Sequence, residues 1–400
     1  LFLQFSGGTT GAQKAVVVTG GMLAHQLDRL RGVLNFSERD GIVSWLPMYH
    51  DMGLIACLWF PLWNAAPSLQ IGAGEWLLKP ELLFEYLDRM HATFCWLPNF
   101  AFSYLAQRRE DMTGAYSLGH VRGWINCSEP VRQRSMQAFA GEFGKWGVSC
   151  DALQASYAMA ENVFAVTQSP LGAPVRTIPR PALGIAPPAY EAGGDVLVSS
   201  GRALPDMDLR IVDASGLERP AGEPGEIQIR TPSLFAGYWG RDGFRTSSLS
   251  ADGWYGTGDY GLVEGGELFV IGRIKDIVIV GGQNIFPEDV ESLAGRLPGV
   301  YPGRVVAFGV EDEQLGTESL AVVAELRGEF NPKAAAALEL EIRKQVLAAI
   351  GVAPRFVAAK PERWIVKSTA GKISRRETRE RFERERLAPI PSAKVQTEVA

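Results

Sequence analysis

The sequence predicts an α/β protein with a large first domain of mostly parallel sheets covered by helices, and a small second domain. Between Val16 and about Phe143, short apolar runs alternate with amphipathic stretches, which is typical of a parallel sheet with both faces covered. From Asp195 to Asp259, dense strand-like runs separated by Gly, Pro and Asp predict a β-rich subdomain. A further strand and helix pattern follows, and 400 residues are too many for one core.

The chain opens with a predicted β-hairpin. LFLQF and AVVV are strand-like, and SGGTTGAQK, residues 6–14, stands between them. Small residues, hydroxyls and a lysine are typical of a phosphate-binding loop. The spacing does not match the P-loop, whose lysine is followed by Ser or Thr and then by a helix. A flexible turn is therefore the alternative interpretation of these residues.

The next elements follow from apolar runs and helix-start signals. Strands are predicted at GIVSWL, PSLQI, ATFCWL and VRGWINC. Helices are predicted after Gly20, Asp51, Pro80, Asn99 and Pro130, with both prolines in first helical turns. The Pro- and Gly-rich residues 169–195 are typical of an inserted loop. LVSSG, LRIVD and GEIQIR then supply strands of the β-rich subdomain.

The C-terminal part predicts a smaller α/β unit beyond GRIKDIVIV. It contains a helix from about Pro287, strands VVAFGV and LAVVAEL, a helix from Pro332 to Ile350, and a basic segment ending near Arg381. The last residues are typical of a tail. We therefore predict a large domain over residues 1–273, a small domain over 274–388 and a tail over 389–400.

Composition excludes several classes of protein. A net charge of −5 provides no basic surface for nucleic acid. The four cysteines form no CxxC pair, which argues against a zinc site or a disulfide framework and favours a cytoplasmic protein. The most apolar stretch, Met52 to Trp63, is too short to span a membrane. The chain begins without Met inside a strand-like run, so we expect an N-terminal part of the first domain to precede Leu1.

Three further stretches carry candidate chemistry. In SYAMAEN, residues 156–162, a Tyr and a Glu could present an aromatic plane and a Mg²⁺ ligand, although a buried Tyr and a solvated Glu are the simpler reading. In WYGTGDYG, Asp259 follows a glycine where a strand meets a turn; it could hold ribose or merely form the turn. In KSTAGKISRRE, Lys372 follows a flexible approach and could enter a site, whereas such charge runs usually lie in solvent.

Together, in this order, the stretches resemble the adenylate-forming superfamily of acyl-CoA synthetases, adenylation domains and luciferases. SWLPMYHDMGLI, INCSEPVR, YAMAE and GELFVIGRIKDIVIVGGQNIFPEDVE are most similar to fatty acyl-AMP ligases. The resemblance runs from Ser6 to about Arg381. It implies ATP-dependent conversion of a fatty or similar acid to acyl-AMP with loss of pyrophosphate, followed by transfer to a phosphopantetheine thiol.

The resemblance also implies a role for each motif residue. The phosphate loop, including Thr9, Thr10, Gly11 and Lys14, would hold the β- and γ-phosphates of ATP. Ser128, Glu129 and Pro130 would border adenine, and Tyr157 would stack on it. Glu161 and Thr10 would hold Mg²⁺, and Asp259 and Arg273 would bind ribose. Lys275 would be the hinge of the small domain, Lys372 would bridge the substrate carboxylate and the α-phosphate, and His50 would stand at the mouth of the acyl pocket.

The residue types suit this chemistry. A carboxylate must attack an α-phosphorus, so Mg²⁺ and a lysine are needed where negative charge accumulates. An acyl carrier protein is the expected acceptor, because residues 169–195 resemble the insertion of the AMP ligases. Gly281-Gly282 resembles the CoA-using branch and favours free CoA instead. A catalytically silent nucleotide-binding module is the third alternative. The joint retention of four residues argues against it: Lys372, Asp259, Arg273 and Glu161.

Overall fold

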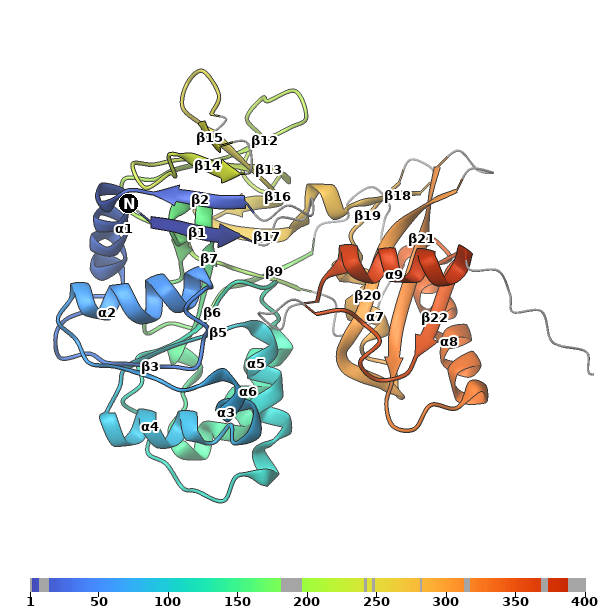
Figure 1. The fold of residues 1–400 in the computed structure, drawn as a ribbon, viewed down its shortest axis with the longest axis horizontal. Helices are drawn as coiled ribbons and strands as arrows, with labels where there is room; N and C mark the ends of the chain where they lie inside the picture. Colours follow the sequence, from blue (N-terminus) through green and yellow to red (C-terminus); the bar gives the residue numbers. More distant parts are fainter. Residues whose placement is uncertain are drawn as a thin grey trace, which may run out of the picture. The chain divides into compact units, whose positions relative to one another are not determined.

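The computed structural model describes residues 2–6, 14–180, 196–240, 243–246, 249–280, 283–312, 317–367 and 373–387. The described chain packs into two units, one ending at Lys275 and the other beginning at Asp276 (Figure 1). The predicted boundary after residue 273 lies close to this division. Rotation of the second unit stays a prediction.

A seven-stranded sheet in the order β11-β8-β7-β6-β5-β3-β4 forms the centre of the first unit. Neighbours from β4 to β7 are parallel, whereas β8 and β11 pair in antiparallel fashion. The mostly parallel sheet is therefore confirmed. Its strands are β3 (Ile42–Ser44), β4 (Ser68–Gln70), β5 (Phe94–Leu97), β6 (Gly123–Asn126), β7 (Leu153–Ala158), β8 (Ala165–Gln168) and β11 (Arg202–Ala203).

Aromatic side chains cover both faces of this sheet, since successive strand residues point to opposite faces. Trp96 of β5 lies with its ring centroid 6.1 Å from that of Phe60. Trp124 of β6 stands opposite Cys95 in the register, and its ring lies 5.1 Å from that of Phe139. The helices are α1 (Gly20–Val33), η1 (Met52–Trp59), α2 (Phe60–Trp63), α3 (Ala73–Leu78), α4 (Leu82–Met90), α5 (Asn99–Gln107) and α6 (Gln133–Phe143), with 3₁₀ turns η2 (Arg109–Asp111), η3 (Gly144–Trp146), η4 (Cys150–Ala152) and η5 (Ala160–Asn162).

The helices are found where they were predicted, but the positions predicted for two prolines are wrong. Pro80 and Pro130 precede α4 and α6 instead of occupying their first turns. For Pro130 the reason is a tertiary contact: the backbone N–H of Arg132 donates to the Asn99 side chain over 3.0 Å and keeps this segment extended. In addition, the helix predicted after Asp51 begins as a π-helix, η1.

The β-rich part of the first unit contains two antiparallel four-stranded sheets. One has the order β1-β2-β14-β15 and includes the predicted hairpin, with Ser6 opposite Lys14. The other has the order β12-β13-β16-β17. The strands are β1 (Phe2–Ser6), β2 (Lys14–Val18), β14 (Gly237–Gly240), β15 (Gly243–Thr246), β12 (Asp208–Val212), β13 (Gly225–Arg230), β16 (Tyr255–Glu264) and β17 (Glu267–Arg273).

The predicted inserted loop is partly a strand, which corrects the sequence interpretation. Within 169–195, β9 (Thr177–Pro179) pairs in antiparallel fashion with β10 (Val196–Val198). Backbone pairing to a distant strand fixes these residues although their Pro and Gly content is typical of a loop. Residues 181–195 lie outside the described part of the chain.

The second unit packs helices on a three-stranded sheet in the order β20-β21-β22. Val305 and Ala307 of β20 belong to the core that α7 and α8 share, whereas Val306 and Phe308 pack on the other face with Phe382 of α9. The basic segment is therefore a core-forming helix. Its elements are 3₁₀ turn η6 (Ile274–Asp276), which spans the division, β18 (Val278–Val280), β19 (Gln283–Ile285), α7 (Pro287–Ala294), β20 (Val300–Asp312), β21 (Thr317–Leu326), α8 (Pro332–Ile350), β22 (Phe356–Lys360) and α9 (Arg375–Leu387).

Candidate active site

Three predicted nucleotide-binding residues meet in the first unit. The Tyr157 hydroxyl of β7 donates to Asp259 Oδ2 over 2.5 Å. Arg273 Nε lies 3.2 Å from the other oxygen, Asp259 Oδ1. Antiparallel pairing of β16 with β17 places Asp259 directly opposite Arg273. The structure thus brings together an aromatic ring, a carboxylate and a guanidinium that the sequence assigned to one nucleotide.

Local backbone structure holds Asp259 in place. Its N–H donates to Thr257 Oγ1 over 3.1 Å, and that hydroxyl donates to the carbonyl of Ile227 over 2.8 Å. Gly258 between them has φ +72°, which glycine adopts without the penalty that a Cβ brings. Gly258 and Asp259 lie inside strand β16, at an irregularity in its pairing with β13, so the turn predicted at this point is wrong. The glycine instead permits the irregular strand backbone that carries the buried carboxylate.

Burial and charge keep Tyr157 as a hydrogen-bond donor. Loss of water around its hydroxyl raises the pKa of Tyr157 well above its usual value, and the negative Asp259 carboxylate adds to the rise. The hydroxyl therefore stays protonated at neutral pH. Its bond to Asp259 fixes the orientation of the ring, which leaves a rigid aromatic plane for stacking.

Glu161 lies on 3₁₀ turn η5 and contacts a tyrosine that the sequence did not single out, which in turn contacts a second one. Tyr238 of β14 donates to Glu161 Oε1 over 2.8 Å, and its hydroxyl lies 3.2 Å from that of Tyr255. Burial, with the Glu161 charge next, raises the pKa of Tyr238, and it raises that of Tyr255 to about 12. No local signal could have found Tyr238, which is 77 residues from Glu161.

Strand pairing joins Glu161 to the predicted phosphate loop. Tyr238 stands opposite Val16 of β2, the strand that begins at Lys14 directly after the loop. The loop residues Thr9, Thr10 and Gly11 lie outside the described part of the chain, and only the backbone of Lys14 is described. The paired strands β2 and β14 nevertheless connect the end of the loop to Glu161, because β2 begins at Lys14 and β14 carries Tyr238.

Glu161 fits the Mg²⁺ ligand that the resemblance implies. Its carboxylate supplies hard oxygens, and the Tyr238 bond orients it without neutralising its charge. Mg²⁺ is usually bound by one or two carboxylates together with substrate phosphates. Among the described residues, no three acidic, His or Cys side chains gather as a closed metal cluster.

Ser128 and Glu129 follow β6 at its C-terminal end. Ser128 has φ +70°, an uncommon conformation for a residue with a Cβ that costs about 1–3 kcal/mol. Glu129 Oε2 accepts from the N–H of Phe100 over 2.9 Å, at the positive end of helix α5. Glu129 thus caps a helix, a structural role that sequence reasoning missed.

His50 stands before the π-helix η1. Its Nδ1 lies 2.7 Å from Asp51 Oδ1, and Asp51 also caps the helix by accepting from the N–H of Met52. A Cβ at Gly53 would lie 2.3 Å from the carbonyl oxygen of Pro47, so only glycine fits here. π-Helical turns occur often at functional sites. No described contact joins His50 to the Tyr157 or Glu161 sets.

Of the two lysines with predicted roles, Lys275 lies among the described residues and Lys372 does not. Lys275 lies in η6, the turn at which the two units divide. Lys372 lies outside the described residues, between Lys367 and Ile373, which form an isolated antiparallel bridge. The position of the Lys372 side chain stays a prediction.

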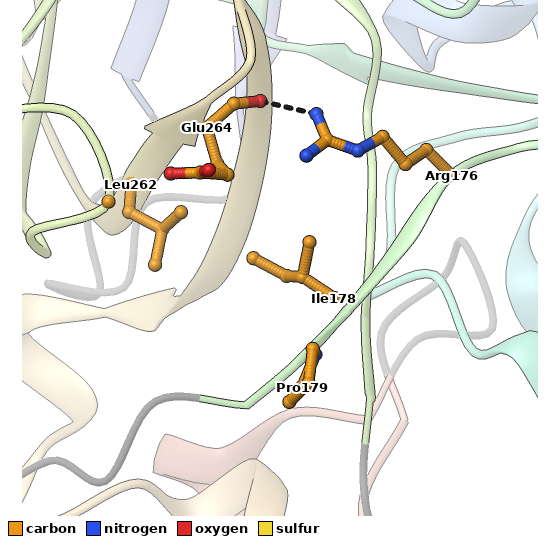
Figure 2. A pocket seen from close by; sticks show the side chains of 6 residues that line it. Arg176, Ile178, Pro179, Leu262 and Glu264 are labelled. Atoms are coloured by element: carbon orange, nitrogen blue, oxygen red, sulfur yellow. Dashed lines mark hydrogen bonds between the residues drawn. The ribbon is translucent and has the colours of Figure 1, made fainter.

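A pocket of about 270 Å³ lies beside the β16–β17 turn and is lined by none of the predicted residues (Figure 2). Arg176 donates from Nη1 to the carbonyl of Glu264 over 2.7 Å, and Ile178 and Leu262 face the hollow. The pocket lies where the segment leading into β9 docks on the first unit. The bond from Arg176 joins the predicted insertion, residues 169–195, to the end of strand β16.

Comparison with known proteins identifies the family. The AMP-binding enzyme family matches residues 1–239, which is more than half of the chain. The chain belongs to this family. The sequence resemblance to adenylate-forming enzymes is thereby confirmed.

Relatives of this AMP-binding enzyme include named AMP ligases. The "Long-chain-fatty-acid--AMP ligase FadD26" of Mycobacterium marinum is 31% identical, over 95% of this chain and 69% of that protein. The "Probable long-chain-fatty-acid--AMP ligase FadD30" of Mycobacterium tuberculosis is 31% identical, over 94% of this chain and 68% of that protein. The resemblance to the fatty acyl-AMP ligase branch is therefore confirmed as well.

Solved structures confirm the fold of the AMP-binding enzyme. A structure from studies of fatty acyl-adenylate ligases of E. coli and L. pneumophila superposes with a TM-score of 0.85 at 25% identity, covering 97% of this chain and 70% of that one. An L. pneumophila ligase in complex with acyl adenylate and pyrophosphate gives a TM-score of 0.66 at 27% identity, covering 98% and 70%. Within the described residues, no helix is long and apolar enough to cross a bilayer.

The AMP-binding enzyme also contains a Ser-His-Asp group that sequence spacing did not reveal. Ser233 Oγ lies 2.6 Å from His25 Nδ1, and Asp206 Oδ2 lies 3.7 Å from His25 Nε2. Ser233 is only 1% exposed, so a substrate cannot reach its hydroxyl. The group therefore ties helix α1 to two distant loops and does not form a hydrolytic site.

Proposed function

We propose that this enzyme activates a fatty or similar carboxylic acid with ATP, forming acyl-AMP and pyrophosphate, and then acylates the phosphopantetheine thiol of an acyl carrier protein. The observation that carries the proposal is the contact of Tyr157, Asp259 and Arg273. It joins an aromatic plane, a buried acceptor and a half-exposed cation, which are the groups that a nucleotide needs.

Asp259 is suited to hold ribose. It is 7% exposed, and Tyr157 and Arg273 each contact one of its oxygens. A carboxylate oxygen has further lone pairs, so each oxygen can also accept from a ribose hydroxyl. Arg273, whose side chain is 52% exposed, supports the same sugar from the solvent side. Tyr157 would stack on adenine, bordered by Ser128, Glu129 and Pro130.

The phosphates of ATP would lie between the loop and Glu161. Thr9, Thr10, Gly11 and Lys14 supply hydroxyls, backbone N–H groups and one cation, which suit the β- and γ-phosphates. Mg²⁺ held by Glu161 and Thr10 would neutralise phosphate charge when bound. Tyr238 keeps the Glu161 carboxylate oriented, and Tyr255 backs Tyr238.

The first half-reaction needs no general base, because the acid is ionised at neutral pH. A carboxylate oxygen attacks the α-phosphorus, a new P–O bond forms, and the bond to the β-phosphate oxygen breaks with its electron pair leaving on pyrophosphate. Lys372 would bridge the carboxylate and the α-phosphate where charge accumulates. His50 would stand where the acyl chain enters.

The second half-reaction requires a thiol acceptor. The thiol sulfur attacks the acyl carbon and a C–S bond forms, while the bond from that carbon to the phosphate oxygen breaks and AMP leaves. The proton of the thiol passes to solvent. We propose that the unit from Asp276 onward turns about Lys275 between the two steps. A carrier protein is favoured by the insertion at 169–195 and by the AMP ligase names among the relatives. Free CoA is the alternative, favoured by Gly281-Gly282 and by relatives named CoA ligases.

Pyrophosphate exchange tests the adenylation step. Purified full-length protein, ATP, Mg²⁺ and a panel of fatty acids should give acid-dependent exchange. Asp259→Ala should abolish most of it. Asp208→Asn, on strand β12 of the same sheet and exposed beside Arg230, is the matched control and should leave exchange unchanged. Nucleotide binding without exchange would instead support a silent module.

Acceptor choice needs a separate experiment. The enzyme is incubated with ATP, Mg²⁺ and a medium-chain acid, once with CoA and once with a phosphopantetheinylated carrier protein, and products are followed by mass. We expect acyl-carrier protein to form and acyl-AMP to persist with CoA. Rapid acyl-CoA formation with little acyl-AMP would overturn the carrier assignment.

We also propose a cytoplasmic location. The four cysteines are free thiols, which suit a reducing compartment.

A further inference from the structure

Arg375, the first residue of α9, connects four segments of the second unit. Its Nη1 donates to Asp276 Oδ2 over 2.6 Å. Its Nη2 donates to Glu291 Oε1 over 2.9 Å and to Glu288 Oε1 over 3.3 Å, and its Nε donates to the carbonyl of Ala307 over 2.9 Å. The guanidinium therefore ties α9 to the turn at Asp276, to helix α7 and to strand β20.

The contacts fix the guanidinium tightly. Its side chain is 21% exposed, as are those of Asp276 and Glu291, and that of Glu288 is 9% exposed. The planar fork of an arginine loses little freedom for each hydrogen bond that it forms. Removing one partner from such a network leaves buried charge uncompensated. We therefore expect the four segments to move as one piece.

The segment that carries Lys372 begins and ends beside this arginine. Lys367 and Ile373 form an antiparallel bridge, and the Ser374 N–H donates to the carbonyl of Val366 over 2.9 Å. Arg375 follows directly. At the other end of the network, Asp276 follows the predicted hinge residue Lys275 without a gap. The Arg375–Asp276 ion pair thus joins two residues that follow lysines with proposed roles: Asp276 directly after Lys275, and Arg375 three positions after Lys372.

We propose that Arg375 is a positioning residue that couples the base of the Lys372 segment to the hinge through Asp276. A rotation that starts at Lys275 is then passed to Lys372 as rigid-body motion instead of being lost in bending of the unit. This inference rests on the proposed function for the roles of the two lysines. Arg375 itself contacts neither substrate nor reacting atoms and acts through Lys372.

The catalytic test compares Arg375→Gln and Asp276→Asn with Arg379→Gln. Arg379 lies one turn later on α9 and pairs only locally with Glu383, so it is the matched control. We expect the first two variants to lower kcat for adenylation by about 10- to 100-fold, because misplacement of about 1 Å has such effects. KM for ATP and thiol transfer from supplied acyl-AMP should change less than about threefold. Arg379→Gln should match the wild type.

A double variant separates positioning from general damage. Combined with Lys372→Ala, Arg375→Gln should cause little further loss of adenylation, because groups that act as a unit are not additive. Multiplied losses, or equal loss of both half-reactions, would overturn the proposal. If Arg375→Gln fails to fold, Asp276→Asn retains the Glu288 and Glu291 contacts and gives the same comparison.

Hydrogen exchange supplies a readout that needs no activity. In Asp276→Asn, the amide of Ser374, which donates to the carbonyl of Val366, should exchange at least about tenfold faster than in wild type, while amides in the β20–β21 ladder stay protected. Arg379→Gln should leave both unchanged. Unchanged exchange at Ser374 would overturn the coupling, whereas absence of pyrophosphate exchange in wild type would overturn only the proposed function.

Discussion

Two arginine–carboxylate clusters, one in each unit, use the same chemistry for different ends. Arg273 lies beside buried Asp259 and keeps about half of its side chain in solvent. Arg375 contacts three carboxylates and a carbonyl and is 21% exposed. A guanidinium with free surface can meet a ligand, whereas one saturated by protein groups holds segments together. Exposure thus distinguishes the Asp259–Arg273 cluster, which we propose as the binding cluster, from the more buried structural cluster around Arg375.

The largest effect should come from Lys372→Ala. Arg375 is saturated by protein groups, so we propose Lys372 as the cation of the second unit that acts in catalysis. Its loss should lower the rate of adenylation by about 10²–10³. Thioester formation from supplied acyl-AMP should persist. Stopped-flow assays of each half-reaction check this. Equal loss of both, with folding intact, would make Lys372 structural.

Lys275→Pro should separate the half-reactions in the opposite sense. Proline fixes φ near roughly −65° and restricts Ile274 before it, so η6 can no longer absorb a rotation. We expect thiol transfer to fall by about 10²-fold and adenylation by less. Unchanged transfer kinetics would place the hinge elsewhere.

Asp259→Asn probes the binding cluster directly. The amide is neutral and still accepts from Tyr157, so folding should survive. Loss of the charge that faces Arg273 and ribose should raise KM for ATP by about 10- to 100-fold, as charge-assisted bonds are worth about 1.5–3 kcal/mol. Kinetics at varied ATP measure it. A KM near the wild-type value would show that ribose binds elsewhere.

The structural cluster around Arg375 should affect the pH dependence of the unfolding free energy and leave the KM for ATP unchanged. Burial raises the pKa of Glu291 from near 4.5 to about 7, and Glu288 adds to the rise against Arg375. The folded state therefore binds more protons than the unfolded state between these values, so the unfolding free energy should fall as pH rises from about 4.5 to 7. Urea unfolding across this range checks the slope. Glu291→Gln should remove it; an unchanged slope would assign it to other groups.

Tyr157→Phe should have the smallest effect. It keeps the aromatic plane and removes only the donor to Asp259. One hydrogen bond to a charged acceptor contributes about 1.5–3 kcal/mol at most, and water can replace part of it here. We expect KM for ATP to rise about three- to tenfold with kcat retained. Titration with ATP in the absence of an acid gives the same ratio independently.

Much of the fold could be predicted from the sequence because its signals are local. Alternating apolar runs marked the parallel strands, and Pro332 to Ile350 was predicted with both ends of α8 correct, since Asn331 caps it and Gly351 ends it. The Gly before Asp259 has the positive φ that favours glycine, although it lies inside strand β16 and not at the predicted turn. Family motifs also named Tyr157, Asp259 and Arg273, which the structure brings into contact.

Tertiary structure alone decided which of these residues meet and what surrounds them. Tyr238 reaches Glu161 from 77 residues away, and Arg375 reaches Asp276 from 99. Glu129 became a helix cap because β6 ends beside α5, and β9 formed within a loop-like segment because β10 pairs with it. Periodicity and turn residues report the conformation of neighbours along the chain. Contacts between distant segments depend on strand order and register, which no local pattern encodes.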